Sequence, residues 1–113
     1  MKSKILSVIL KQLRSSPDFT LTGIKKYRDL LNSSAKIFKT DKKVDFKKFH
    51  IDSIPAAWIT PGNVTEKRVI LYLHGGGFVA GSITSHRDLA TRIAKASKAK
   101  VLIIDYRLAP EHK

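Results

Sequence analysis

The sequence has no cysteine, a single methionine and a single tryptophan, and few acidic residues. Without cysteine there is no disulfide framework, no cysteine nucleophile and no thiolate metal site. No stretch approaches the roughly 20 consecutive apolar residues that a membrane-spanning helix requires. The short apolar run at residues 5–10 is followed at once by Lys11 and has no cleavage site. We therefore interpret the start as mature sequence and expect a cytoplasmic protein.

The shortage of acidic residues leaves a strongly basic chain. Nine Asp and Glu stand against 22 Lys and Arg, a formal net charge of +13. Such a charge favours anionic partners, so one interpretation is a non-enzymatic module that binds nucleic acid or anionic membrane through the lysine-rich helices of residues 1–48. No aromatic platform or glycine-rich basic segment accompanies these lysines, and the simpler interpretation is an ordinary lysine-rich surface.

The rest of the composition is that of one small globular domain. The 113 residues, 42% of them hydrophobic, suffice for one domain but are too few for two. Apolar residues at helical spacing predict a first helix around residues 5–13 and a second over residues 21–38. The stretch Ser15-Ser16-Pro17-Asp18 separates them.

From residue 44 the hydrophobic period changes from helical to alternating. Residues 44–51 and 54–60 predict an antiparallel pair of strands joined near Asp52-Ser53. Pro61-Gly62-Asn63 predicts the turn that ends the second strand. The β-branched and aliphatic residues 69–73 predict a third strand, which we expect to be buried.

The last part of the chain predicts a helix followed by a strand. Ser85 is the expected cap of a helix over residues 86–99, with inward-facing side chains at Leu89, Ile93, Ala94 and Ala96. The continuous apolar residues 101–104 predict a strand buried on both faces of a parallel sheet. Together with the third strand these elements form a βαβ unit, so the expected fold class is α/β.

The junction after the third strand carries the strongest chemical signal. His74-Gly75-Gly76-Gly77-Phe78, the glycine turn, follows residues 69–73 directly. Glycines let the backbone turn sharply and bring bare N–H groups close to a bound group, which is how hydrolases build an oxyanion hole. HGGG-type turns occur in lipases and esterases. A plain tight turn or a phosphate loop is the alternative, although neither glycine spacing typical of phosphate loops is present.

A second motif strengthens this interpretation. With the later Asp105-Tyr106-Arg107-Leu108-Ala109-Pro110-Glu111-His112, the glycine turn resembles the hormone-sensitive-lipase branch of the α/β-hydrolases, which includes many microbial carboxylesterases. The resemblance implies the N-terminal half of an α/β-hydrolase sheet, about four strands with the fourth between the second and third, preceded by two cap-type helices. It divides the chain into a helical cap segment, residues 1–43, and an incomplete hydrolase domain, residues 44–113.

The resemblance also implies residue roles for a carboxylic ester substrate, with no cofactor and no metal. The backbone N–H groups of Gly76 and Gly77 are the expected oxyanion donors, His74 orients the loop, and Phe78 walls the acyl pocket. In the second motif we expect a scaffold in which Arg107 pairs with Asp105 or Glu111 and braces the glycine turn. None of the four histidines is a credible catalytic base, and His50 is expected at the surface.

The nucleophile of such an enzyme is absent from these 113 residues. No G-x-S-x-G elbow occurs, and Gly81-Ser82-Ile83-Thr84-Ser85 has neither the spacing nor a preceding strand. The resemblance places the serine, acid and base after Lys113. We therefore expect a truncated esterase or lipase that is inactive alone and exposes an open sheet edge at its third strand. The isolated chain is expected to be poorly stable, aggregation-prone or dependent on a partner, and one candidate partner is a complementing C-terminal polypeptide.

Overall fold

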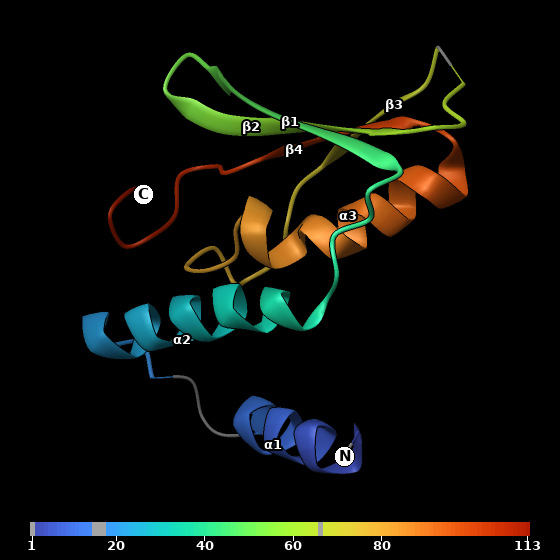
Figure 1. The fold of residues 1–113 in the computed structure, drawn as a ribbon. Coiled ribbons are helices and arrows are strands. Elements are labelled where there is room, and N and C mark those ends of the chain that lie inside the picture. The colour runs from blue at the N-terminus through green and yellow to red at the C-terminus, as the bar shows by residue number, and fades with distance from the viewer. Residues whose placement is uncertain (1, 15–17, 66) are drawn as a thin grey trace.

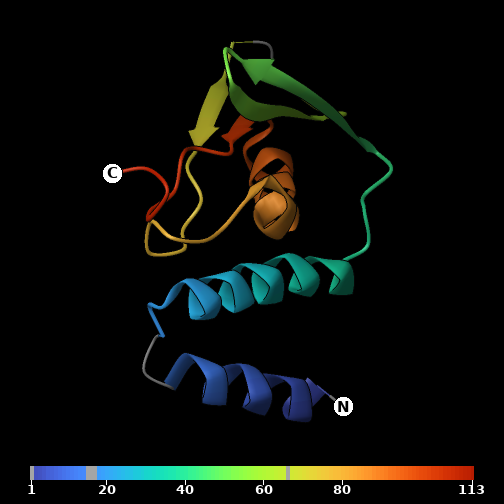
Figure 2. The same ribbon diagram turned by 90° about the vertical axis from the view of Figure 1, so that its left-hand side faces the viewer.

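The computed structural model describes residues 2–14, 18–65 and 67–113, which form a mixed sheet with helices on one side. In chain order the elements are α1 (Lys2–Arg14), α2 (Leu21–Ser34), the 3₁₀ helix η1 (Ala35–Ile37), β1 (Val44–Ile51), β2 (Ile54–Pro61), β3 (Val69–Tyr72), α3 (Ile83–Ser97) and β4 (Lys100–Ile104). Figures 1 and 2 show the sheet above α3, with α2 and then α1 in further layers below.

The two N-terminal helices lie where the apolar spacing predicts them. α2 begins at Leu21, because Thr20 is extended and its hydroxyl accepts the N–H of Gly23 at 3.1 Å. The α-helix ends at Ser34 and tightens into η1, so the helix predicted to reach residue 38 is shorter than expected. The predicted break at Ser15-Ser16-Pro17 lies outside the described residues. Within the described residues, no helix is both long and apolar enough to cross a membrane.

The sheet has the predicted topology. Its strand order is β1-β2-β4-β3, so the fourth strand lies between the second and the third. β1 and β2 form the expected antiparallel hairpin, β4 pairs antiparallel with β2, and β3 pairs parallel with β4, with Leu71 opposite Leu102. The βαβ unit of β3, α3 and β4 is therefore confirmed.

Helix α3 begins earlier than its predicted start. Its cap is Ser82, whose hydroxyl accepts the Ser85 N–H at 3.1 Å while the Ser85 hydroxyl accepts the Ser82 N–H at 2.9 Å. The prediction of Ser85 as the cap was wrong because this reciprocal pair makes Ser85 the third helical residue. The helix ends at Ser97, where Lys98 takes the left-handed conformation, rather than at residue 99.

One face of the sheet is packed and the other is not covered. Inward residues of the strands and of α3 form the core, namely Ala57, Ile59, Val101, Ile103, Ile83, Ala90 and Ala94. Ala94 is buried as predicted and Ile93 packs against this core, but Leu89 and Ala96 are exposed because residues 83, 90 and 94 set the inward side of α3. Within the described residues, no helix covers the opposite face (Figures 1 and 2).

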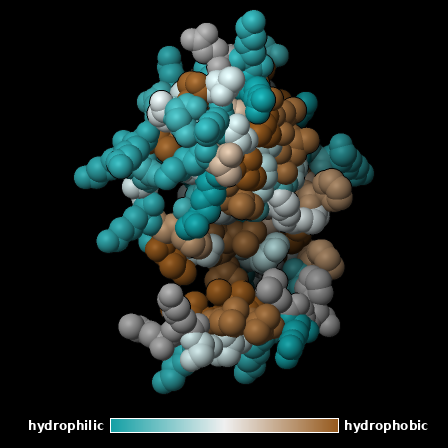
Figure 3. All heavy atoms as spheres, turned by 90° about the vertical axis from the view of Figure 1, so that its right-hand side faces the viewer, coloured by the Kyte–Doolittle hydropathy of each residue, from teal (hydrophilic) through white to brown (hydrophobic). Residues whose placement is uncertain are grey.

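The uncovered face corrects two predictions of burial. β3 is not a buried strand but the edge of the sheet, with Val69, Leu71 and Leu73 57%, 56% and 58% exposed. β4 is buried on one face only, since Leu102 and Ile104 on the other face are half-buried. Figure 3 shows hydrophobic side chains gathered on one flank of the sheet. The open edge expected at the third strand is therefore present, and it adjoins an exposed apolar surface.

Candidate functional site

The glycine turn leaves the end of β3 with a run of positive φ angles. Gly76, Gly77 and Phe78 have φ of 141°, 64° and 64°. The turn closes on itself, because the N–H groups of Val79 and Ala80 both donate to the carbonyl oxygen of Gly76, at 3.3 and 3.1 Å. This geometry holds the chain in a compact loop above the carboxyl end of the strand.

The three glycines are not equivalent. A Cβ on Gly76 would run into the carbonyl group of Ala80, so both its φ and its space require glycine. A Cβ on Gly77 would meet no atom within 4 Å, and its φ alone favours glycine there. Gly75 has open space and no positive φ. The turn is therefore closely packed at Gly76, whereas no other atom of the described residues lies next to the Cβ position of Gly77.

Four consecutive backbone donors of the turn, the N–H groups of residues 75–78, are free among the described residues. Among the hydrogen bonds of the described residues, none uses the N–H of Gly76 or of Gly77. Phe78, the next residue, exposes 79% of its surface. Unpaired N–H groups in consecutive residues are the arrangement from which anion-binding loops are made.

His74 anchors the start of the turn. It is 3% exposed, and its ring stacks on Tyr106 at 4.3 Å and on His86 at 5.4 Å between ring centroids. The Tyr106 hydroxyl donates to the His74 carbonyl, and the His74 Nδ1 lies 3.1 Å from the Gly75 carbonyl oxygen. A Cβ on Gly81 would run into the His74 ring, so the end of the loop packs directly on this histidine. The turn thus rests on a buried aromatic stack.

His86, which stacks on His74, has a pKa below the ordinary value of a histidine. Burial lowers the pKa of His86, and the neighbouring His74 lowers it further. The His86 Nδ1 lies 2.8 Å from the Ser85 hydroxyl, and the Tyr72 ring is 6.3 Å away. The folded state therefore favours neutral His86.

We expect the folded chain to lose stability on mild acidification. The unfolded chain takes up a proton at His86 as the pH falls through about 6.5, whereas the folded chain resists this uptake. The urea midpoint should therefore fall between about pH 7.5 and about pH 5.5. His86→Gln should reduce this fall in the urea midpoint. The control variant His50→Gln changes an exposed histidine and should leave the fall unchanged. An unchanged pH dependence in His86→Gln would contradict the assignment.

The second motif holds the loop through contacts that differ from the predicted ones. Arg107 is exposed and pairs with neither Asp105 nor Glu111, so that prediction was wrong. Asp105 instead accepts the Ile83 N–H at 2.6 Å, because the first N–H groups of α3 lack partners within the helix. Glu111 pairs with Arg28 of α2 at 2.7 Å, and the Ala109 N–H donates to the Phe78 carbonyl at 2.9 Å.

Arg28 is the residue that sequence reasoning missed. In the sequence it is one basic residue among many in a lysine-rich helix, and nothing in its spacing distinguishes it. His50 is exposed, as predicted. Across the described residues, no three His, Cys, Asp or Glu side chains come together in a way that would hold a metal ion.

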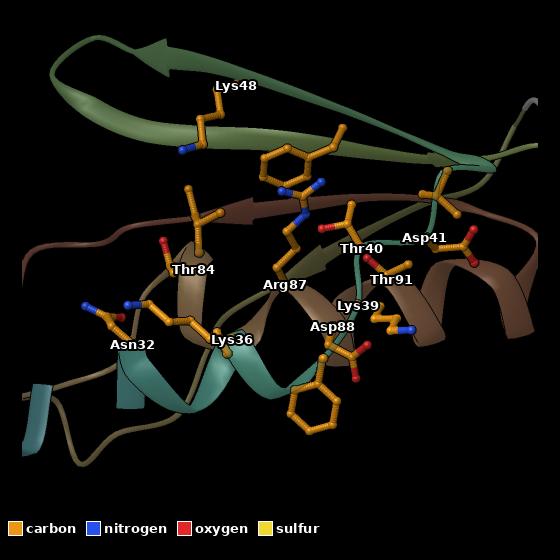
Figure 4. Close-up of a pocket in the computed structure, with 15 residues that line it drawn as sticks. Asn32, Lys36, Lys39, Thr40, Asp41, Lys48, Thr84, Arg87, Asp88 and Thr91 are labelled. Atoms are coloured by element: carbon orange, nitrogen blue, oxygen red, sulfur yellow. The ribbon is translucent and has the colours of Figure 1, made fainter. Parts of the chain in front are cut away.

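A separate cavity of about 300 Å³ lies between η1, β1 and α3 (Figure 4). The Arg87 guanidinium lies over the Phe46 ring at 3.7 Å in its wall. Both of its acidic residues already have cationic partners, Asp41 with Lys95 and Asp88 with Arg92. No residue of the glycine turn lines this cavity, so the candidate site is the turn itself.

Known proteins similar to this chain include an esterase and a deacetylase-like protein. A family profile described as the alpha/beta hydrolase fold matches residues 70–113. An esterase of Acinetobacter venetianus is 29% identical over 85 residues, 75% of this chain and 28% of that protein. Human arylacetamide deacetylase-like 3 is 38% identical over 77 residues, 66% of this chain and 19% of that protein.

The solved structures similar to this chain also include an esterase. An esterase of the bacterial hormone-sensitive lipase family superposes with a TM-score of 0.79 at 30% identity, and the match covers 96% of this chain and 35% of that one. The chain therefore spans about a third of the length of the solved structure and less of the two sequence relatives.

Proposed function

Because the chain belongs to the α/β-hydrolase superfamily and matches an N-terminal portion of enzymes of its hormone-sensitive-lipase branch, we propose that it supplies the oxyanion-hole part of a carboxylic ester hydrolase. The observation that carries the proposal is the pair of free N–H groups at Gly76 and Gly77, held at the carboxyl end of β3. The serine nucleophile and its acid and base come from a complementing C-terminal segment or polypeptide.

The chemistry follows from the charge that develops during acyl transfer. When a serine attacks an ester carbonyl, the carbonyl oxygen becomes negative in the tetrahedral intermediate. The N–H groups of Gly76 and Gly77 donate to that oxygen, and a third donor comes from the residue after the nucleophile. Because the loop is already closed by the Gly76 carbonyl, these donors need no reorganisation during the reaction.

The neighbouring residues have supporting roles in this proposal. His74 keeps the start of the loop in place through its buried stack. Phe78, exposed beside the donors, forms a wall of the acyl pocket once the complementing part is bound. Residues 1–43 form the helical cap segment and residues 44–113 the first part of the catalytic domain. The exposed apolar residues of β3 are the surface on which the complementing part packs.

The purified chain should therefore hydrolyse esters poorly. We expect no serine-dependent turnover of a short-chain p-nitrophenyl ester, because these 113 residues contain no nucleophile elbow. Heat-denatured chain at the same concentration is the control for background hydrolysis. Turnover that a serine-directed phosphonate abolishes would contradict the proposal that the nucleophile comes from elsewhere. The basic-module interpretation and the cytoplasmic location stay predictions from composition alone.

A further inference from the structure

Arg28 of α2 contacts three residues in two other parts of the chain at once. Its Nε donates to the Val79 carbonyl at 2.6 Å and its Nη2 to the Ala109 carbonyl at 2.9 Å. Its Nη1 and Nη2 also donate to the two carboxylate oxygens of Glu111, at 2.7 and 2.9 Å. One side chain thus connects α2 to the residue that directly follows the glycine turn and to the second motif, both more than 50 residues further along the chain.

A second contact of α2 lies one helical turn away. The Ser82 hydroxyl donates to the Asn32 Oδ1 at 2.6 Å. Residues four apart lie on the same face of a helix, so Arg28 and Asn32 face the loop together. Arg28 contacts Val79 and Asn32 contacts Ser82. These two contacts lie on either side of Ala80 and Gly81, in the segment between the glycine turn and α3. Helix α2 thus contacts both ends of the segment 79–82, which connects the glycine turn to α3.

The backbone of the loop is closed from the other side as well. The Ala109 N–H donates to the Phe78 carbonyl, while the Ala109 carbonyl accepts from Arg28. Phe78 and Val79 are therefore held between the second motif and α2. Arg28 lowers the pKa of the Glu111 carboxyl to about 2, so this ion pair remains charged at neutral pH.

We propose that Arg28 is a positioning residue for the glycine turn, through which α2 fixes the backbone that presents the Gly76 and Gly77 donors. This proposal rests on the proposed function. It requires the planar fork of arginine, whose N–H groups point in several fixed directions, rather than a positive charge alone. A lysine at this position reaches the carboxylate or a carbonyl, but not two carbonyls and the carboxylate together. The cap segment and the glycine turn are therefore mechanically coupled.

The test compares Arg28→Lys with Arg92→Lys in the full chain, using amide hydrogen exchange measured by NMR. Arg92 is the matched control because it makes an exposed ion pair with Asp88 on α3 and no contact with the loop. We expect Arg28→Lys to accelerate exchange at Val79, Ala80 and Ala109 by about tenfold or more relative to the buried strand residue Ile59. Arg92→Lys should leave the ratio unchanged.

Two results would overturn the proposal. Unchanged exchange at Val79 and Ala109 in Arg28→Lys would show that charge alone suffices. An equal acceleration at Ile59 would show that Arg28 stabilises the whole fold and not the loop in particular. Exchange reports loop order whether or not the loop binds an oxyanion, so a failure of the proposed function is measured separately, by ester turnover.

Discussion

Gly76→Ala lowers the free energy of unfolding by about 3 kcal/mol, whereas Gly77→Ala lowers it by about 1 kcal/mol. Both residues have positive φ, which disfavours any side chain. Only at Gly76 does the added Cβ also run into a neighbouring carbonyl, that of Ala80, a residue that is fully buried. The carbonyl of Gly76 itself accepts the Val79 and Ala80 N–H groups, so a shift of this residue also weakens the closure of the loop.

Urea unfolding followed by circular dichroism measures both variants. The matched pair separates the cost of the φ angle, which the two glycines share, from the cost of the lost space, which is particular to Gly76. Equal losses would contradict the packing that we assign to the loop. A larger loss of unfolding free energy in Gly77→Ala than in Gly76→Ala would show that Gly77, and not Gly76, is the glycine without space for a side chain.

The sequence predicts the sheet well because its signals are local and repeated. Alternation along residues 44–51 and 54–60 sets the β1–β2 hairpin, and the apolar runs that flank α3 set the βαβ unit. The position of β4 between β2 and β3 followed from the family resemblance rather than from the hydrophobic period.

Burial is predicted less well, because an apolar run does not reveal what covers it. Residues 69–73 read as a buried strand, yet β3 is an edge with half-exposed side chains. The cap of α3 was misplaced for a similar reason. Ser82 and Ser85 are both good capping residues, and only the reciprocal pair in three dimensions shows which of them starts the helix.

Long-range contacts are the hardest to predict. The roles expected of Gly76, Gly77, His74 and Phe78 come from a motif that the sequence contains, and they stay proposals. Arg107 has the expected chemistry for bracing the loop, but Arg28 is the arginine that reaches it, from a helix 51 residues before Val79. A sequence pattern marks a charged residue as available but does not specify its partner.

Removal of the Gly77 N–H, one of the two proposed oxyanion donors, should lower the rate of ester hydrolysis strongly. We expect this in a chimera in which the chain replaces the matching portion of the Acinetobacter venetianus esterase, which supplies the remaining residues. Replacement of Gly77 by glycolic acid exchanges its N–H for an ester oxygen and adds no side chain. Loss of one oxyanion donor lowers kcat by about 10²- to 10³-fold. KM should change little, because the donor acts mainly on the charged intermediate.

The same exchange at Gly62, in the turn after β2, is the matched control because it lies outside the glycine turn. The most direct test of the oxyanion-donor role of Gly77 is the ratio of kcat for p-nitrophenyl butyrate hydrolysis between the unmodified chimera and the Gly77 ester. We expect a ratio of about 10² or more for the Gly77 ester and of about 1 for the Gly62 ester. Equal kcat values for the unmodified chimera and the Gly77 ester would contradict the assignment of Gly77 as an oxyanion donor.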